Sequence, residues 1–127
     1  MTMPRRILVV DDEAPIANAV GMKLRNAGME VIVALDGQEA YELAMAERPD
    51  FIVTDLQMPG MSGLELTARL AAELGGGIPT ILLTAKGFEL DGAAVAGLPI
   101  RRIMTKPFSP RELLSAVQEE LGEAVTS

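Results

Sequence analysis

Two residue types that carry much of protein chemistry are missing from this chain of 127 residues, which has no cysteine and no histidine. Without cysteine there is no disulfide, no thiolate nucleophile and no thiolate ligand for a metal ion. Without histidine the chain builds neither an imidazole-ligated metal site nor a Ser-His catalytic pair, and it carries no phosphohistidine of its own. Its chemistry must therefore come from carboxylates, hydroxyls and a few lysines.

Positive charge and long apolar runs are also scarce. Lys and Arg number 11 against 18 Asp and Glu, a net charge of −7, which argues against a general nucleic-acid binder and a polybasic membrane-surface protein. No apolar run approaches the roughly 18 residues that span a bilayer, and the first one ends at Asp11, too early for a signal peptide. We expect a cytoplasmic protein with no membrane insertion and no direct contact with nucleic acid.

Short apolar runs typical of buried strands alternate with longer segments of helical period. The runs lie at 7–10, 31–34, 51–54, 80–83 and 102–104. The helical segments lie at 14–27, 37–48, 62–74 and 109–121, with a weak Gly- and Ala-rich one within 88–96. This alternation predicts an α/β fold, a doubly wound three-layer sandwich with a five-stranded parallel sheet and five helices.

Three of these helices carry the same start signal, a hydroxyl or carboxylate followed three residues later by Glu. The pairs are Asp36 with Glu39, Ser62 with Glu65, and Ser109 with Glu112.

We expect a single domain over 1–127, with its core at about 5–122 and no output domain. The initiator-like Met1 and the polar tail Glu123–Ser127 favour a natural single-domain protein over a fragment of a longer regulator.

Polar residues that interrupt the apolar strand pattern cluster where the strands end. They are Asp11 and Asp12 after the first run, Asp55 after the third, Thr84 after the fourth and Lys106 after the fifth. The carboxyl ends of parallel strands form one edge of the sheet, where ligands bind in open α/β folds. One such residue has a ready explanation as a helix cap, but all of them together indicate a single site.

Three carboxylates at one site repel one another, by roughly 4 kcal/mol for two charges 4 Å apart at an effective dielectric of 20. Such a group either takes up a proton or binds a cation. With oxygen ligands alone, Mg²⁺ (or Mn²⁺) fits best. Lys106 and Thr84 add a positive charge and a hydroxyl donor, which suit the oxygens of a phosphoryl group. The pattern therefore predicts a phosphoryl group transferred onto an aspartate.

The chain closely resembles the receiver domains of two-component response regulators, the CheY-like family. The resemblance rests on segments that follow one another in the family's order: Val9-Val10-Asp11-Asp12-Glu13, the run from Asp50 to Gly63, Leu83-Thr84-Ala85 and Lys106-Pro107-Phe108. It implies a flavodoxin-like sheet of strand order 2-1-3-4-5. It also implies a phosphoacceptor that gains and loses its own phosphoryl group rather than a turnover enzyme.

The resemblance also implies a role for each site residue. Asp55 would accept the phosphoryl group, Lys106 would pair with it, and Thr84 would be the switch hydroxyl. Mg²⁺ would be held by Asp12, Asp55 and the main-chain carbonyl of Gln57, with Asp11 acting mostly through water. The N–H of Ala85 would donate to the phosphate, and Pro107 would follow a cis bond.

The implied partners are a sensor histidine kinase or a histidine phosphotransfer protein, and a downstream protein target. The domain would be a monomer or a weak phosphorylation-dependent dimer. Ile103 stands where many relatives carry Tyr or Phe, so we expect a core or interface residue there and assign the switching to Thr84. We hypothesise that Arg101, Arg102 and Arg111 form a docking face for an acidic partner or a second copy.

Two other classes of protein remain open on the sequence alone. A Mg²⁺-dependent phosphatase of the haloacid-dehalogenase type also forms an aspartyl phosphate, but its nucleophile lies in an Asp-x-Asp pattern after the first strand and its body is larger. A pseudo-receiver keeps the fold without being phosphorylated, but it usually lacks the acceptor, a metal-binding acid or the lysine, all of which are present here.

Overall fold

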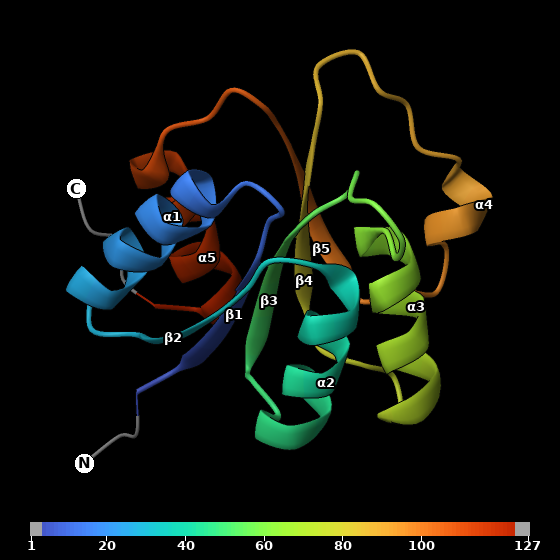
Figure 1. The fold of residues 1–127 in the computed structure, drawn as a ribbon, viewed down its shortest axis with the longest axis horizontal. Coiled ribbons are helices and arrows are strands. Elements are labelled where there is room, and N and C mark those ends of the chain that lie inside the picture. The colour runs from blue at the N-terminus through green and yellow to red at the C-terminus, as the bar shows by residue number, and fades with distance from the viewer. Residues whose placement is uncertain (1–3, 124–127) are drawn as a thin grey trace.

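The computed structural model describes residues 4–123, which form one parallel sheet with helices on both faces (Figure 1). Met1 and the tail residues 124–127 lie outside the described residues. In chain order the elements are β1 (Arg6–Val10), α1 (Ala14–Asn26), β2 (Glu30–Ala34), α2 (Gly37–Glu47), β3 (Phe51–Asp55), α3 (Gly63–Glu73), β4 (Thr80–Thr84), α4 (Gly92–Val95), β5 (Ile100–Thr105) and α5 (Pro110–Leu121).

The sheet has the strand order β2-β1-β3-β4-β5, and all four neighbouring pairs are parallel. In the middle of the sheet Val9 lies opposite Val33 on one side and Val53 on the other. This confirms the predicted flavodoxin-like α/β sandwich. Parallel order places the carboxyl ends of β1, β3, β4 and β5 along one edge.

The sheet separates two apolar cores, and this explains why the central strands have consecutive apolar residues, such as Ile7–Val10 and Phe51–Val53, rather than an alternating pattern. On one face Ile7 and Val9 pack with side chains of α1 and α5, and on the other Leu8 and Val10 pack with those of α2 and α3. Figure 1 shows α1 and α5 together on one side of the sheet, and α2 and α3 on the other. Phe51 of β3, almost fully buried, belongs to the first core.

The three predicted start signals form as expected. The side chain of Asp36 accepts the N–H of Glu39 at 2.8 Å, and those of Ser62 and Ser109 accept the N–H groups of Glu65 and Glu112, both at 3.1 Å. Each bond satisfies a backbone donor that has no partner inside its helix. The caps thereby fix where α2, α3 and α5 begin.

The weak segment within 88–96 forms only one helical turn, α4, capped by Asp91. Its Gly and Ala residues offer little apolar surface to hold a longer helix against the sheet. The following strand β5 is longer than predicted and alternates between half-buried and exposed residues. Ile103 is 45% exposed, so of the two roles expected for it, a core position is wrong and an interface position stays a prediction.

Arg102 does not fit the hypothesis of a three-arginine docking face. Its guanidinium lies 2.9 Å from a carboxylate oxygen of Glu119 and 2.8 Å from one of Glu120, both on α5. Strand alternation turns Arg102 toward α5 and turns its neighbour Arg101 outward. Arg101 and Arg111 are exposed, as the hypothesis requires.

Over residues 4–123, no helix has the length and apolar character needed to cross a membrane.

Candidate functional site

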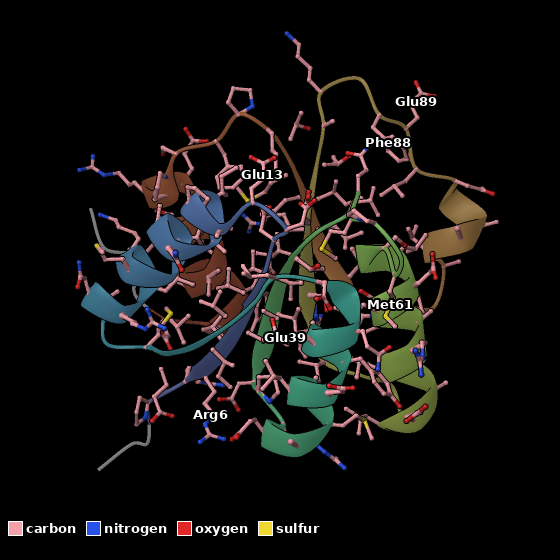
Figure 2. All side chains as sticks on the ribbon, viewed as in Figure 1. Arg6, Glu13, Glu39, Met61, Phe88 and Glu89 are labelled. Carbon is pink, nitrogen blue, oxygen red and sulfur yellow. The ribbon has the colours of Figure 1, made fainter. Side chains whose placement is uncertain are left out.

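The predicted site residues meet at the carboxyl edge of the sheet. Asp11 and Asp12 directly follow β1, Asp55 and Thr84 are the last residues of β3 and β4, and Lys106 directly follows β5. In Figure 2 Glu13, Phe88 and Glu89 mark this edge, and Arg6 marks the opposite one. Segments far apart in the sequence therefore contribute to one site.

Three carboxylates lie close together here. One oxygen from each of Asp11, Asp12 and Asp55 lies within 4.8 Å of the others. Asp11 and Asp55 are buried, at 1% and 5% exposure, and Asp12 is exposed. Burial raises the pKa of Asp55, repulsion from Asp11 raises it further, and the attraction of Lys106 only partly offsets these effects. An ionised carboxylate is thus held where it costs free energy.

Lys106 is the cation of the site. Its ammonium nitrogen lies 3.3 Å from Oδ2 of Asp11 and 3.3 Å from Oδ1 of Asp55. Burial lowers the pKa of Lys106, but the two carboxylates outweigh burial and the pKa is raised. Lys106 therefore stays protonated, and its single charge is shared between two anions.

Backbone contacts hold these side chains in place. The N–H of Glu13 donates to Oδ1 of Asp11 at 2.9 Å, and the N–H of Lys106 donates to the carbonyl of Thr84 at 2.8 Å. The Lys106–Pro107 peptide bond is cis, as the resemblance implied. At Gly63 a Cβ atom would lie 2.3 Å from the carbonyl oxygen of Asp55, so only glycine lets α3 begin this close to the end of β3.

Thr84 is buried at 3% exposure, and among the described residues nothing bonds to its hydroxyl oxygen. Buried polar groups nearly always have a hydrogen-bond partner, because leaving one unpaired costs free energy. Sequence reasoning placed Thr84 at this edge and did not foresee that its hydroxyl is unpaired. The unpaired hydroxyl is therefore able to donate a hydrogen bond to a group that binds beside the acids.

Gln57 was predicted for its main-chain carbonyl only. The structure shows a contact of its side chain as well: Oε1 accepts the N–H of Ala85 at 3.1 Å. This bond connects the loop after β3 with the loop after β4. No sequence motif signals it, because it depends on where both loops turn.

The donor set suits a hard divalent cation. Every side chain in the acid cluster offers only oxygen, and the carboxylates crowd together with one nearby ammonium group to offset them. Such oxygen-only sites favour Mg²⁺ or Mn²⁺ over metals that prefer nitrogen or sulfur. The residues present therefore fit the ion that the sequence predicted.

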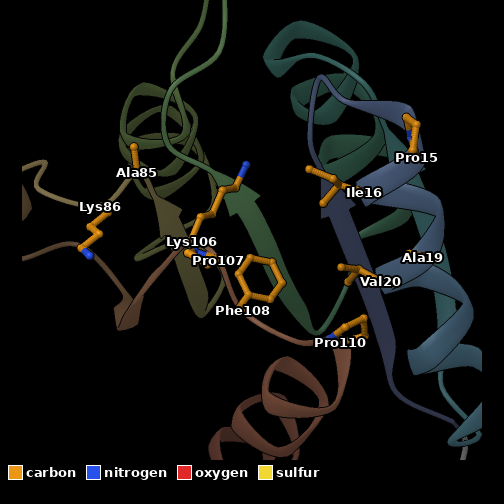
Figure 3. A pocket seen from close by; sticks show the side chains of 10 residues that line it. All are labelled: Pro15, Ile16, Ala19, Val20, Ala85, Lys86, Lys106, Pro107, Phe108 and Pro110. Carbon is orange, nitrogen blue, oxygen red and sulfur yellow. The ribbon is translucent and has the colours of Figure 1, made fainter.

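An apolar hollow of about 550 Å³ opens beside the lysine (Figure 3). Its walls come from α1, from the loop after β4 and from the loop between β5 and α5, and include Ile16, Val20, Ala85, Pro107 and Phe108. In Figure 3 the Lys106 side chain extends from this hollow toward the end of β3. The hollow thus places apolar surface directly beside Lys106.

A parallel sheet of order 2-1-3-4-5 with clustered acids and a lysine at its carboxyl edge is the arrangement that the resemblance to receiver domains implied. The sequence model of the response regulator receiver domain family matches residues 7–118. The chain therefore belongs to the response regulator receiver domain family of two-component signalling.

Solved structures agree with this assignment. The Vibrio cholerae chemotaxis response regulator CheY4 is 30% identical, with a TM-score of 0.82 over 92% of this chain and 98% of that one. The receiver domain of the Francisella response regulator 1452 is 31% identical, with a TM-score of 0.79 over 91% and 94%. A CheY-like receiver domain protein of Methanospirillum hungatei JF-1 is 26% identical, with a TM-score of 0.84 over 94% and 95%.

Proposed function

We propose that this receiver accepts a phosphoryl group on Asp55 from a histidine kinase or a histidine phosphotransfer protein, in a reaction that requires Mg²⁺ or Mn²⁺. The observation that carries the proposal is the placement of Asp55 within 3.3 Å of Lys106 and beside the other two acids. Phosphorylation then shifts the domain between two conformations and so controls a downstream protein.

The transfer uses one oxygen of Asp55 as the nucleophile. This oxygen attacks the phosphorus of the donor's phosphohistidine, a P–O bond forms, and the P–N bond breaks with its electron pair left on the imidazole nitrogen, which takes up a proton. The ammonium group of Lys106 pairs with an oxygen of the transferred group. Asp12, Asp55 and the main-chain carbonyl of Gln57 would hold Mg²⁺, with Asp11 acting mostly through water, and the ion would neutralise negative charge on that group.

Reversal of the modification needs only water, which attacks the phosphorus of the acyl phosphate and releases inorganic phosphate from Asp55. In this proposal the domain catalyses its own phosphorylation and its own dephosphorylation, and it does not turn over a separate substrate. The unpaired hydroxyl of Thr84 supports its proposed role as switch, because a phosphoryl oxygen offers the partner that it lacks. We place the protein in the cytoplasm, as a monomer or a weak phosphorylation-dependent dimer.

Intact-mass spectrometry after incubation with acetyl phosphate and Mg²⁺ tests the proposal. The wild type should gain one phosphoryl group, and Asp55→Asn, or the wild type in EDTA, should gain none. Asp50→Asn is a matched control, because Asp50 lies just before the same strand and its carboxylate accepts the N–H of Arg6 at the opposite edge of the sheet. It should be phosphorylated like the wild type.

Four results would contradict the proposal, and each has its own meaning. Phosphorylation that persists in Asp55→Asn, or that EDTA leaves undiminished, removes the assigned acceptor or the metal. No uptake from acetyl phosphate or from a phosphohistidine donor makes the domain a pseudo-receiver. Repeated hydrolysis of simple phosphate esters makes it a phosphatase.

A further inference from the structure

The side chain of Gln57 occupies a backbone donor that lies at the carboxyl edge of the sheet. In β3 and β4 the last shared rung is the bond from the N–H of Leu56 to the carbonyl of Leu83, at 2.8 Å. A regular parallel ladder would continue with the N–H of Ala85 donating to the carbonyl of Leu56. That bond is not the one formed here.

The carbonyl of Leu56 is engaged elsewhere. It accepts the N–H of Gly63, the first residue of α3, at 2.9 Å. The close approach of Gly63 to the carbonyl of Asp55 fixes this turn. The N–H of Ala85 is therefore left without its ladder partner, and Oε1 of Gln57 takes the place of the missing carbonyl at 3.1 Å.

This arrangement sets up a competition. Ala85 directly follows Thr84, and Gln57 comes two residues after Asp55, so the bond joins the two loops that carry residues next to the acid site. A phosphoryl group on Asp55 would carry charged oxygens, which accept a hydrogen bond more strongly than a neutral amide oxygen. Both acceptors compete for one N–H, and the bond between Gln57 and Ala85 is exposed and easily broken.

We propose that Gln57 is a positioning residue that holds the Ala85 amide in the unphosphorylated state and releases it when a phosphoryl group or its mimic binds at Asp55. The inference rests on the function proposed above. While the bond exists, it fixes the loop after β4 in its resting position, so Gln57 lowers the affinity of the site for the phosphoryl group. Removing the acceptor should favour the phosphorylated conformation.

The first test is nuclear magnetic resonance on metal-free protein without any phosphate. Gln57→Met keeps the length of the side chain and removes the acceptor, so the amide proton of Ala85 should move upfield and exchange faster with solvent than in the wild type. Gln38→Met is the matched control, because Gln38 is also an exposed glutamine with a single side-chain bond, to Glu42. It should leave the Ala85 signal unchanged. An unchanged Ala85 signal in Gln57→Met overturns the proposal.

The second test is titration with beryllofluoride, a phosphoryl mimic, in the presence of Mg²⁺. Gln57→Met should bind it about 2- to 10-fold more tightly than the wild type, the range expected for one neutral hydrogen bond. Equal or weaker binding in Gln57→Met, with normal binding by the wild type, overturns the role of Gln57 and leaves the proposed function standing. If the wild type itself binds no beryllofluoride and takes up no phosphoryl group, the proposed function fails and the competition fails with it.

Discussion

The ammonium nitrogen of Lys106 lies 3.3 Å from Oδ1 of Asp55 and equally far from Oδ2 of Asp11. One positive charge thus faces two buried carboxylates, and a third carboxylate, that of Asp12, lies close by. The resting site has more negative than positive charge. The carboxylates therefore repel one another, and a bound cation would relieve that repulsion.

Asp55→Asn should make the metal-free protein more stable. The pKa of Asp55 is raised, so its ionised form at neutral pH destabilises the fold, and a neutral amide of the same shape removes that cost. We expect the free energy of unfolding to rise in urea denaturation with EDTA present. Exposed Glu89→Gln is the control and should change little. Mg²⁺ should stabilise the wild type more than Asp55→Asn, and a loss of stability in Asp55→Asn without metal would contradict this view of the site.

Thr84→Val should separate binding from switching. Valine has nearly the shape of threonine, and the Thr84 hydroxyl has no bond to lose at rest. The free energy of unfolding should therefore stay equal or rise, by up to about 1 kcal/mol. The variant should still bind beryllofluoride with Mg²⁺ but lose most of the amide shift changes that the mimic induces in residues 85–105.

Ile103→Val is the comparison for that experiment. Ile103 is 45% exposed, so losing one methylene should cost less than about 1 kcal/mol, and the shift changes induced by beryllofluoride should remain. Shifting the population from almost entirely the resting conformer to almost entirely the active one requires a ligand that binds the active conformer more tightly by about 5.5 kcal/mol. If Ile103→Val loses the response as fully as Thr84→Val does, the switch does not depend on Thr84 in the way proposed here.

The neighbouring arginines of β5 should behave differently. Arg102→Gln breaks two ion pairs with α5 and should lower the free energy of unfolding by about 0.5–1 kcal/mol at low salt, with a smaller loss at high salt. Arg101→Gln should leave stability within about 0.5 kcal/mol, because that side chain is exposed. Equal effects of both changes in urea denaturation would contradict the assignment of Arg102 to the fold.

A docking role is then left to Arg101 and Arg111. In sedimentation experiments with beryllofluoride and Mg²⁺, any self-association should weaken with added salt and in Arg101→Glu, since opposite charges attract less when screened or reversed. Self-association that is unaffected by both conditions would remove the hypothesis for a second copy of the domain.

Tyr41 gives the fold a measurable dependence on alkaline pH. Its hydroxyl donates to Glu73 on the neighbouring helix α3, and this bond raises the pKa of Tyr41. The bond of the protonated hydroxyl therefore stabilises the fold. This stabilisation is complete below the ordinary tyrosine pKa of about 10 and is lost as the pH rises through the pKa of Tyr41 in the folded protein. Stability should thus fall more steeply in the wild type than in Tyr41→Phe as the pH rises above about 10.

Tyr41 is the only tyrosine in the chain, so tyrosinate absorbance reports it alone. Glu73→Gln should bring the pKa of Tyr41 back toward its ordinary value, although Arg69 still lies over the ring, 4.1 Å from its centroid. An unchanged absorbance titration in Glu73→Gln would show that the bond has no influence on Tyr41.

Most of the fold and the site was predictable because each depends on local sequence. Apolar runs mark strands buried on both faces, and the capping pairs mark where helices begin. The acids, Thr84 and Lys106 follow strand ends, and parallel pairing alone brings strand ends together. Their relative positions needed no knowledge of side-chain packing.

What was not predictable depends on register and on side-chain direction. Arg102 meets Glu119 and Glu120 only because β5 and α5 lie side by side with this register. The bond from Ala85 to Gln57 exists because the carbonyl of Leu56 turns toward Gly63. The extent of α4 was uncertain because Gly and Ala residues bury too little surface to fix a helix by pattern alone.

The division of the interior by the sheet has a consequence for how this protein tolerates change. Leu8 and Val9 are adjacent in β1, yet their side chains belong to separate cores. A volume lost on one face is out of reach of side chains on the other, so compensating substitutions must arise within the same core. Substitutions in the two cores are then independent of each other, and the site keeps its position because the strand ends hold its residues.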